Sequence, residues 1–308
     1  MVKRARHDFI HTYSLYIIAV VTVIVLSYIA RPVEVSHFNV VIPSVKKETQ
    51  VSMYDQKAFD NVNVKAKAYV VYDLIDKKII ASKNENQVLP LASITKIMMA
   101  MTALAHNATT TRITINPSSV NGGYDLGLKK NQVWDLDELL KYTLIFSSNN
   151  GAQAIADGLG GREKFVSQMN TDATTLGLNT LQFTHPAGLD VDNKLGGVGS
   201  ALEVAKLFGI AIKRFPEILD VTTKLRTTVT ASTGKIIGIP NTNQGITEFG
   251  DIEASKTGFT DRAGGNLAVI VDITVGHPVV IVVLGSTYSE RFTDVENLYH
   301  ALQKSLNK

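Results

Sequence analysis

Ser93 and Lys96 are the first residues in this sequence whose types and spacing could carry out a reaction. Residues three apart on a helix share one face, so the hydroxyl and the amine could come within hydrogen-bond distance. A desolvated lysine can be neutral and can take the proton of a serine, which makes the serine a nucleophile for acyl transfer. A serine that caps a helix beside a solvent-directed lysine has the same spacing, and the spacing recurs at residues 44–47 and 305–308. The pair therefore indicates acyl transfer only together with further groups.

Two later segments offer such groups. Ser147 could relay a proton to a leaving group, and the amide of Asn149 could hold a substrate peptide, although a polar loop between helices has a similar composition. Lys256 and Thr257 could present a cation and a hydroxyl to a substrate carboxylate at the edge of a strand. Gly258 would leave room there for the backbone of a ligand. An ordinary strand end followed by a turn is the alternative interpretation of this second segment.

The elements around these groups predict an α+β fold. Residues 93–106 have the apolar spacing of a buried helix that the loop 89–92 enters, and a helix N-terminus offers N–H groups and a favourable dipole to a developing oxyanion. Strands are predicted near both ends of the folded part, and helices in the middle. The predicted strands are residues 66–73, 78–82, 227–231, 235–239, 253–258, 266–275 and 278–285. We expect the terminal strands to form one antiparallel sheet, with a cleft between this sheet and the helical lobe.

Two helix starts have the sequence of a capping box. Asp135 precedes Glu138 by three residues, and Ser200 precedes Glu203 by the same spacing. In such a box the first side chain accepts a hydrogen bond from the backbone of the fourth residue. We therefore predict that Asp135 and Ser200 cap the helices that follow them.

The three segments together resemble a known family. Their order is Ser-x-x-Lys, Ser-x-Asn, Lys-Thr-Gly, and it is similar to that of the penicillin-recognising serine acyltransferases, most closely the D-alanyl-D-alanine carboxypeptidases of peptidase family S11. The resemblance runs from about residue 66 to residue 285. It includes Leu-Pro-Leu-Ala-Ser-Ile-Thr-Lys-Ile-Met-Met at 89–99, Phe-Thr-His-Pro-Ala-Gly-Leu-Asp at 183–190 and Lys-Thr-Gly-Phe-Thr at 256–260. Two positions depart from the family pattern, because Asn150 stands where Asp is usual and Leu91 where Pro is common.

The resemblance implies a role for each matched residue. Ser93 matches the acyl-ester nucleophile, Lys96 its proton acceptor and Ser147 the second active-site serine. The substrate-binding positions are matched by Asn149, Lys256, Thr257, Gly258 and Phe259. Within that set Lys256 and Thr257 match the carboxylate-binding pair, and the backbone N–H groups of Ser93 and Phe259 would form the oxyanion hole.

The resemblance also implies an architecture and an activity. The expected fold is β-lactamase/transpeptidase-like, with an antiparallel sheet flanked by terminal helices and an inserted helical lobe. The implied activity is trimming of peptidoglycan stem peptides that end in D-Ala-D-Ala, with β-lactams as inhibitors and with no metal or cofactor. Cleavage of cross-links as a D,D-endopeptidase, transpeptidation by the same site, and a non-catalytic wall-sensing protein stay open as alternatives. No second domain is expected after the catalytic one.

The N-terminus predicts a membrane anchor. Residues 9–30 contain no Asp, Glu, Lys or Arg, and a helix of that length extends roughly 33 Å, enough to cross a bilayer core. Lys3, Arg4 and Arg6 precede it, which favours a cytoplasmic N-terminus and an extracytoplasmic remainder. A cleaved signal peptide is the alternative. The expected organisation is a cytoplasmic tail at 1–8, a transmembrane helix at 9–31, a stalk at 32–62 and a catalytic domain at 63–308.

Composition and missing motifs exclude other classes. The 308 residues carry a net charge of only +3 with no long basic run, so a nucleic-acid partner is not expected. There is no cysteine, which excludes disulfides and thiolate catalysis. The sequence has no Gly-x-Ser-x-Gly elbow, no His-Glu-x-x-His zinc motif and no complete phosphate-binding loop. It also lacks the Glu-x-x-Leu-Asn string that a class A β-lactamase would be expected to carry.

Overall fold

The protein was analysed as a computed structural model that describes residues 20–26, 53–120, 128–231 and 233–306. The chain divides into two compact units, Met1–Val51 and Ser52–Lys308. In the first unit the described residues, 20–26, are helical. The second unit contains all the residues for which a chemical role is expected.

A five-stranded antiparallel sheet forms the centre of the second unit, in the order β10-β11-β12-β1-β2. Its strands are β1 (Ala68–Asp73), β2 (Lys78–Lys83), β10 (Asp251–Thr260), β11 (Gly264–Asp272) and β12 (Pro278–Ser286). The pairing of β1 with β12, in the register Val70↔Val282, joins the two ends of the unit in one sheet. The sequence predicted this arrangement.

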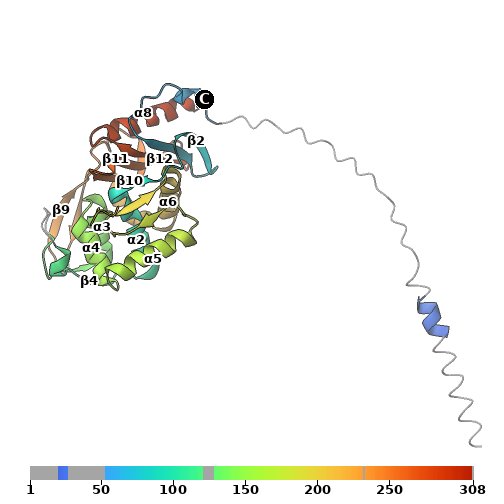
Figure 1. Cartoon of the computed structure of the whole chain (residues 1–308), viewed down its shortest axis with the longest axis horizontal. Coiled ribbons are helices and arrows are strands. Elements are labelled where there is room, and N and C mark those ends of the chain that lie inside the picture. Colours follow the sequence, from blue (N-terminus) through green and yellow to red (C-terminus); the bar gives the residue numbers. More distant parts are fainter. Residues whose placement is uncertain (1–19, 27–52, 121–127, 232, 307–308) are drawn as a thin grey trace, which may run out of the picture. The chain divides into compact units, whose positions relative to one another are not determined.

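Both faces of the sheet are buried, which explains the nearly continuous apolar run in β12. Alternate residues of a strand point to opposite faces. Val279, Ile281 and Val283 belong to the core beneath helix α8 (Glu290–Ser305). Val280 and Val282 belong to the larger core shared with the helical lobe. Figure 1 shows the sheet between α8 on one side and the lobe on the other.

The helical lobe lies between β2 and β10 in the sequence. Its helices are α2 (Thr95–His106), α3 (Leu136–Ile145), α4 (Asn149–Gly158), α5 (Arg162–Thr175), α6 (Ala201–Arg214) and α7 (Pro216–Asp220). Short 3₁₀ turns are η1 (Gln56–Phe59), η2 (Ala92–Ile94), η3 (Pro117–Ser119) and η4 (Val221–Thr223). Of the two terminal helices expected to flank the sheet, α8 is present, whereas the described residues before β1, 53–67, form one 3₁₀ turn, η1, which contacts α8.

Among the described residues, the lobe also contains three small sheets. One has the order β3-β7-β6, and the other two pair β4 with β5 and β8 with β9. Their bounds are β3 (Leu89–Pro90), β4 (Arg112–Thr114), β5 (Val133–Asp135), β6 (Gln182–Phe183), β7 (Gly197–Gly199), β8 (Arg226–Thr230) and β9 (Ile236–Pro240). Only the pairing of β8 with β9 was predicted, because strands of two or three residues leave no periodic pattern in a sequence.

One predicted helix cap is present and the other is wrong. Ser200 accepts a hydrogen bond from the backbone N–H of Glu203 at the start of α6. Asp135 does occupy the N-cap position of α3, but its side chain makes no cap hydrogen bond. Its carboxylate pairs instead with the Arg112 guanidinium at 3.2 Å. The ion pair across the strands β4 and β5 competes with the cap for the same oxygen atoms.

The predicted membrane anchor at residues 9–31 lies mostly outside the described residues, as do the predicted tail and most of the stalk. Its described part, 20–26, is helical and exposed. Across residues 20–26, 53–120, 128–231 and 233–306, no helix combines the length and apolar character needed to traverse a bilayer.

Candidate active site

The turn that carries Ser93 is held by backbone contacts on both sides. Ser93 lies in the 3₁₀ turn η2, two residues before the first residue of α2, which corrects the predicted helix start at Ser93. The N–H of Leu91 donates to Gly197 O at 2.9 Å, next to the pairing of β3 with β7. Ala92 has a φ of 48°, a left-handed conformation that non-glycine residues rarely adopt. Such strained backbone gathers at functional sites, and here it turns the chain directly before the serine.

Lys96 is buried, and its side-chain nitrogen points at the serine. Nζ lies 2.7 Å from Ser93 Oγ, 2.8 Å from Asn149 Oδ1 and 2.9 Å from Ala187 O. The side chain is 0% exposed, so these contacts replace its hydration shell. The predicted pairing of serine and lysine on one face is therefore present, and Asn149 joins it from the first residue of α4.

Ala187 and His185 are parts of the site that sequence reasoning did not assign. His185 Nδ1 accepts a hydrogen bond from the N–H of Ala187 at 3.1 Å, and this turn directs the Ala187 carbonyl at Lys96. Burial, the Arg162 guanidinium and the Lys96 ammonium lower the pKa of His185 from 6.5 to about 4. The ring is therefore neutral near pH 7 and keeps Nδ1 as an acceptor. The only signal in the sequence was that both residues belong to the segment that resembles the family.

Ser147 connects the second segment to the third. It lies between α3 and α4 with a φ of 59°, again left-handed for a residue with a side chain. Its Oγ lies 2.8 Å from Lys256 Nζ, although the two residues are 109 positions apart in the sequence. Ser148 beside it caps α4 by accepting from the N–H of Gly151 at 2.8 Å. The neighbouring serines thus have different contacts, since Ser148 caps a helix and Ser147 contacts Lys256.

Lys256 and Thr257 lie on β10, the edge strand, and both are buried. Burial, the Lys96 ammonium and the Arg291 guanidinium lower the pKa of Lys256 well below its ordinary value. Thr257 Oγ1 lies 2.7 Å from the hydroxyl of Thr242, a contact that sequence reasoning missed. The backbone N–H of Thr242 in turn donates to Ile145 O at 3.1 Å, which ties β10 to the end of α3.

The structure explains the glycine at position 258 by a close backbone contact, and not by the predicted room for a ligand. A Cβ atom at this position would lie 2.7 Å from Leu91 O and 3.2 Å from Ser93 N. The strand therefore approaches the backbone of the turn that carries Ser93 so closely that no side chain fits. Phe259 follows with a side chain that is 43% exposed and packs edge-on against the Tyr288 ring, with 5.0 Å between centroids.

The candidate residues thus meet at one place. Ser93 comes from η2 and Lys96 from the start of α2, Ser147 and Asn149 come from the junction of α3 and α4, and the remaining four come from β10. Direct contacts below 3 Å join Ser93 to Lys96, Lys96 to Asn149 and Ser147 to Lys256. The serine hydroxyls, the amines of Lys96 and Lys256, and the Thr257 hydroxyl in one cluster are suited to acyl transfer to a substrate that carries a carboxylate.

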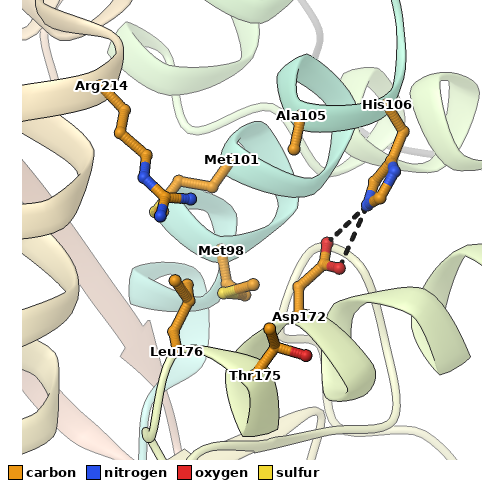
Figure 2. Close-up of a pocket in the computed structure, with 8 residues that line it drawn as sticks. All are labelled: Met98, Met101, Ala105, His106, Asp172, Thr175, Leu176 and Arg214. Atoms are coloured by element: carbon orange, nitrogen blue, oxygen red, sulfur yellow. Dashed lines mark hydrogen bonds and ion pairs between the residues drawn. The ribbon is translucent and has the colours of Figure 1, made fainter.

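A separate hollow lies on the opposite face of α2 (Figure 2). Met98 and Met101 line it, together with Arg214 and the ion pair of His106 with Asp172. Met98 is two residues after Lys96, which places the two side chains roughly 200° apart around the helix. None of the eight candidate site residues lines this hollow.

Comparison with known proteins identifies the family. The family model of peptidase S11, described as D-alanyl-D-alanine carboxypeptidase, matches residues 54–287. The chain belongs to peptidase family S11. This S11 peptidase is 31% identical over 221 residues to the D-alanyl-D-alanine endopeptidase of Escherichia coli (strain K12). The match covers 70% of this chain and 69% of that relative. It is 28% identical over 252 residues to the D-alanyl-D-alanine carboxypeptidase DacF of Bacillus subtilis (strain 168). That match covers 79% of this chain and 64% of DacF.

A solved structure supports the same assignment. Penicillin-binding protein D2 from Listeria monocytogenes, in its ampicillin-bound form, superimposes with a TM-score of 0.69 at 27% identity. The match covers 79% of this chain and 99% of that chain. The S11 peptidase therefore has the α+β fold of the penicillin-binding proteins, as the resemblance implied.

Proposed function

We propose that this S11 peptidase is a serine D-alanyl-D-alanine carboxypeptidase that trims peptidoglycan stem peptides through an acyl-enzyme on Ser93. The observation that carries the proposal is the 2.7 Å contact between Lys96 Nζ and Ser93 Oγ in a buried site. A base must lie within hydrogen-bond reach of the proton that it removes, and this contact meets that requirement.

The reaction begins with transfer of the Ser93 hydroxyl proton to neutral Lys96. The serine oxygen then attacks the carbonyl carbon of the penultimate D-alanine, and the carbonyl oxygen takes up negative charge. The N–H groups of Ser93 and Phe259 stabilise that charge. When the peptide bond breaks, the terminal D-alanine nitrogen receives the proton from Lys96, directly or through Ser147. Water then hydrolyses the acyl-enzyme, with Lys96 as base and Ser93 as the leaving group.

The terminal carboxylate of the substrate binds at Lys256 and Thr257. In the free protein, burial and the neighbouring Lys96 and Arg291 lower the pKa of Lys256, so its charged form is disfavoured. A substrate carboxylate reverses this balance, because an opposite charge favours the ammonium form. The same carboxylate group is present in β-lactams, so penicillins are the expected covalent inhibitors.

Cleavage of cross-linked peptides is the second candidate. The relative from Escherichia coli named endopeptidase is 31% identical to this chain, and DacF of Bacillus subtilis, named carboxypeptidase, is 28% identical. The two activities share the acyl-enzyme and differ in the amine that leaves. We therefore propose measuring D-alanine release from a pentapeptide and cleavage of a cross-linked dimer with the same preparation. Faster turnover of the pentapeptide supports the carboxypeptidase, whereas cleavage of the dimer alone overturns that choice.

We further propose that the N-terminal segment anchors the enzyme in a membrane with the catalytic unit outside the cytoplasm. The support is the uncharged stretch at residues 9–30 with basic residues before it. Membranes that carry the full chain can be extracted with alkaline carbonate. Retention at full apparent mass supports an anchor, retention only of a shortened chain supports a cleaved segment, and complete release of the full chain contradicts the proposal.

A further inference from the structure

Arg291 lies behind the active-site strand in the first turn of α8. Its side chain is only 4% exposed, and Nη1 donates a hydrogen bond to Gly258 O at 3.2 Å. The centre of the guanidinium lies 4.5 Å from the centroid of the Tyr288 ring and 4.7 Å from that of Phe292. Burying a guanidinium is costly unless its surroundings compensate, so this placement requires a reason.

The acceptor atom explains the placement. The carbonyl of Gly258 and the N–H of Phe259 belong to the same planar peptide unit, and in a trans peptide they point in opposite directions. A donor fixed on the carbonyl side therefore sets the direction of the N–H on the other side. It also increases the positive charge on that hydrogen, because hydrogen bonds in a chain polarise one another.

The strand lies against the turn that carries Ser93 at this peptide. The close approach of Gly258 to Leu91 O and Ser93 N puts the backbone of η2 against the strand at this point. The peptide thus lies between a buried cation and the turn that carries the reactive hydroxyl. An oxyanion hole needs N–H groups whose direction is fixed before the reaction, and this arrangement fixes one of them.

Aromatic packing holds the arrangement together. The Tyr288 ring contacts the guanidinium on one side and packs edge-on against Phe259 at 5.0 Å on another. Arg291 and Phe259 are therefore linked both through the peptide and through one ring. Rotation of the Gly258–Phe259 peptide would break the hydrogen bond from Arg291 and the ring contact between Phe259 and Tyr288.

We propose that Arg291 is a positioning residue for the oxyanion hole, which it orients and polarises by donating to the carbonyl of the peptide that supplies the Phe259 N–H. This inference rests on the proposed acyl-enzyme function. Arg291 does not touch the substrate in this role. It acts on the rate of acylation through the Gly258–Phe259 peptide, and much less on initial binding.

The test compares full-length Arg291→Met and Arg291→Lys with the matched control Arg262→Met. Methionine retains an apolar stem between the two rings but cannot donate, whereas lysine retains a donor. Arg262 is an exposed arginine on the turn after β10 that also donates to a backbone carbonyl, that of Asn193 at 2.9 Å.

Removing an oxyanion donor outright slows acylation about 10²–10³-fold, so weakening one should slow it less. We expect Arg291→Met to lower the first-order acylation rate by labelled penicillin about tenfold, with an initial dissociation constant close to that of the wild type.

Infrared spectroscopy of the acyl-enzyme separates polarisation from general loosening. The ester carbonyl absorbs at lower wavenumber when the oxyanion hole bonds strongly to its oxygen. We expect the band to move to higher wavenumber in Arg291→Met, to move less in Arg291→Lys and to stay in place in Arg262→Met. If Arg291→Met folds poorly, Arg291→Gln takes its place with the same expected result.

Two outcomes overturn the inference. One is an unchanged acylation rate and carbonyl band in the Arg291 variants, and the other is a slower rate with an unchanged band, which a merely structural role would produce. Failure of the wild type to form an acyl-enzyme has a different meaning, because it contradicts the proposed function itself.

Discussion

The side-chain nitrogen of Lys96 lies 2.7 Å from the hydroxyl oxygen of Ser93, and the same nitrogen lies 2.8 Å from Asn149 Oδ1. One buried amine therefore joins two of the three sequence segments. The third segment, which contains Lys256, joins the second through the 2.8 Å contact between Lys256 Nζ and Ser147 Oγ. The proposed function depends on the meeting of these three segments, and each contact can be tested separately.

Replacing the proposed base should abolish acylation without unfolding the protein. Lys96→Met keeps a long apolar side chain in the buried position but cannot accept a proton. A positioned acid or base contributes about 10²–10⁴-fold, so we expect a loss of that order in the acylation rate by labelled penicillin. Lys206→Met, at an exposed position on α6, is the control and should acylate normally. An Lys96→Met protein that acylates as fast as the control removes Lys96 from the mechanism.

Adding one methyl group at Gly258 should separate the strand from the nucleophile turn. The new Cβ would lie 2.7 Å from Leu91 O, which is backbone and cannot rotate away. Overpacking of this kind costs about 1–3 kcal/mol, and we expect slower acylation together with a lower melting temperature. Gly238→Ala in strand β9 is the matched control, since a Cβ there has nothing within 4 Å. Equal behaviour of the two variants in thermal unfolding and acylation would show that the close approach is unimportant.

The neutral His185 ring should make the free energy of unfolding depend on pH. Its pKa falls from 6.5 in the unfolded chain to about 4 in the fold, so the unfolded state binds more protons between these values. The resulting stability is fully present above about pH 6.5 and is lost as the pH falls towards 4. The charged groups that act on the ring are Arg162, Lys96 and Asp157.

Denaturant unfolding at several pH values measures this effect. His185→Asn can still accept from the Ala187 N–H through its side-chain oxygen, but it does not titrate. We expect the difference between wild type and variant to shrink or reverse from pH 7 to pH 4. Parallel curves for the two proteins over this range would contradict the assignment of a neutral buried ring.

Binding of a substrate carboxylate should transfer a proton onto Lys256. The pKa of this lysine is lowered in the free protein, mainly by burial, and a bound carboxylate raises it again. In a Ser93→Ala background, which leaves the substrate intact, calorimetric titration with a D-Ala-D-Ala peptide in buffers of different ionisation enthalpy reports proton uptake. We expect net uptake that disappears when Lys256→Met is added. Uptake that persists in the double variant assigns the proton to another group.

The sequence predicted the main sheet and the convergence of the three segments because both depend on strong signals. The apolar run in β12 and the order of the catalytic segments needed no knowledge of neighbouring loops. Ala187 and Thr242 were missed since they act through a backbone carbonyl and through a hydroxyl on a distant loop, and neither leaves a pattern in the sequence. Asp135 was assigned a cap that it does not make, because the competing Arg112 becomes its neighbour only when β4 pairs with β5.

Identification of the acylated residue tests the central claim most directly. The full-length protein is incubated with labelled penicillin, digested, and the peptides are analysed by mass spectrometry beside Ser93→Ala and Ser147→Ala. We predict a single adduct on the peptide that carries Ser93, retained though formed more slowly in Ser147→Ala and lost in Ser93→Ala. Labelling of Ser93→Ala at the wild-type level, or an adduct on the peptide that carries Ser147, would contradict the account.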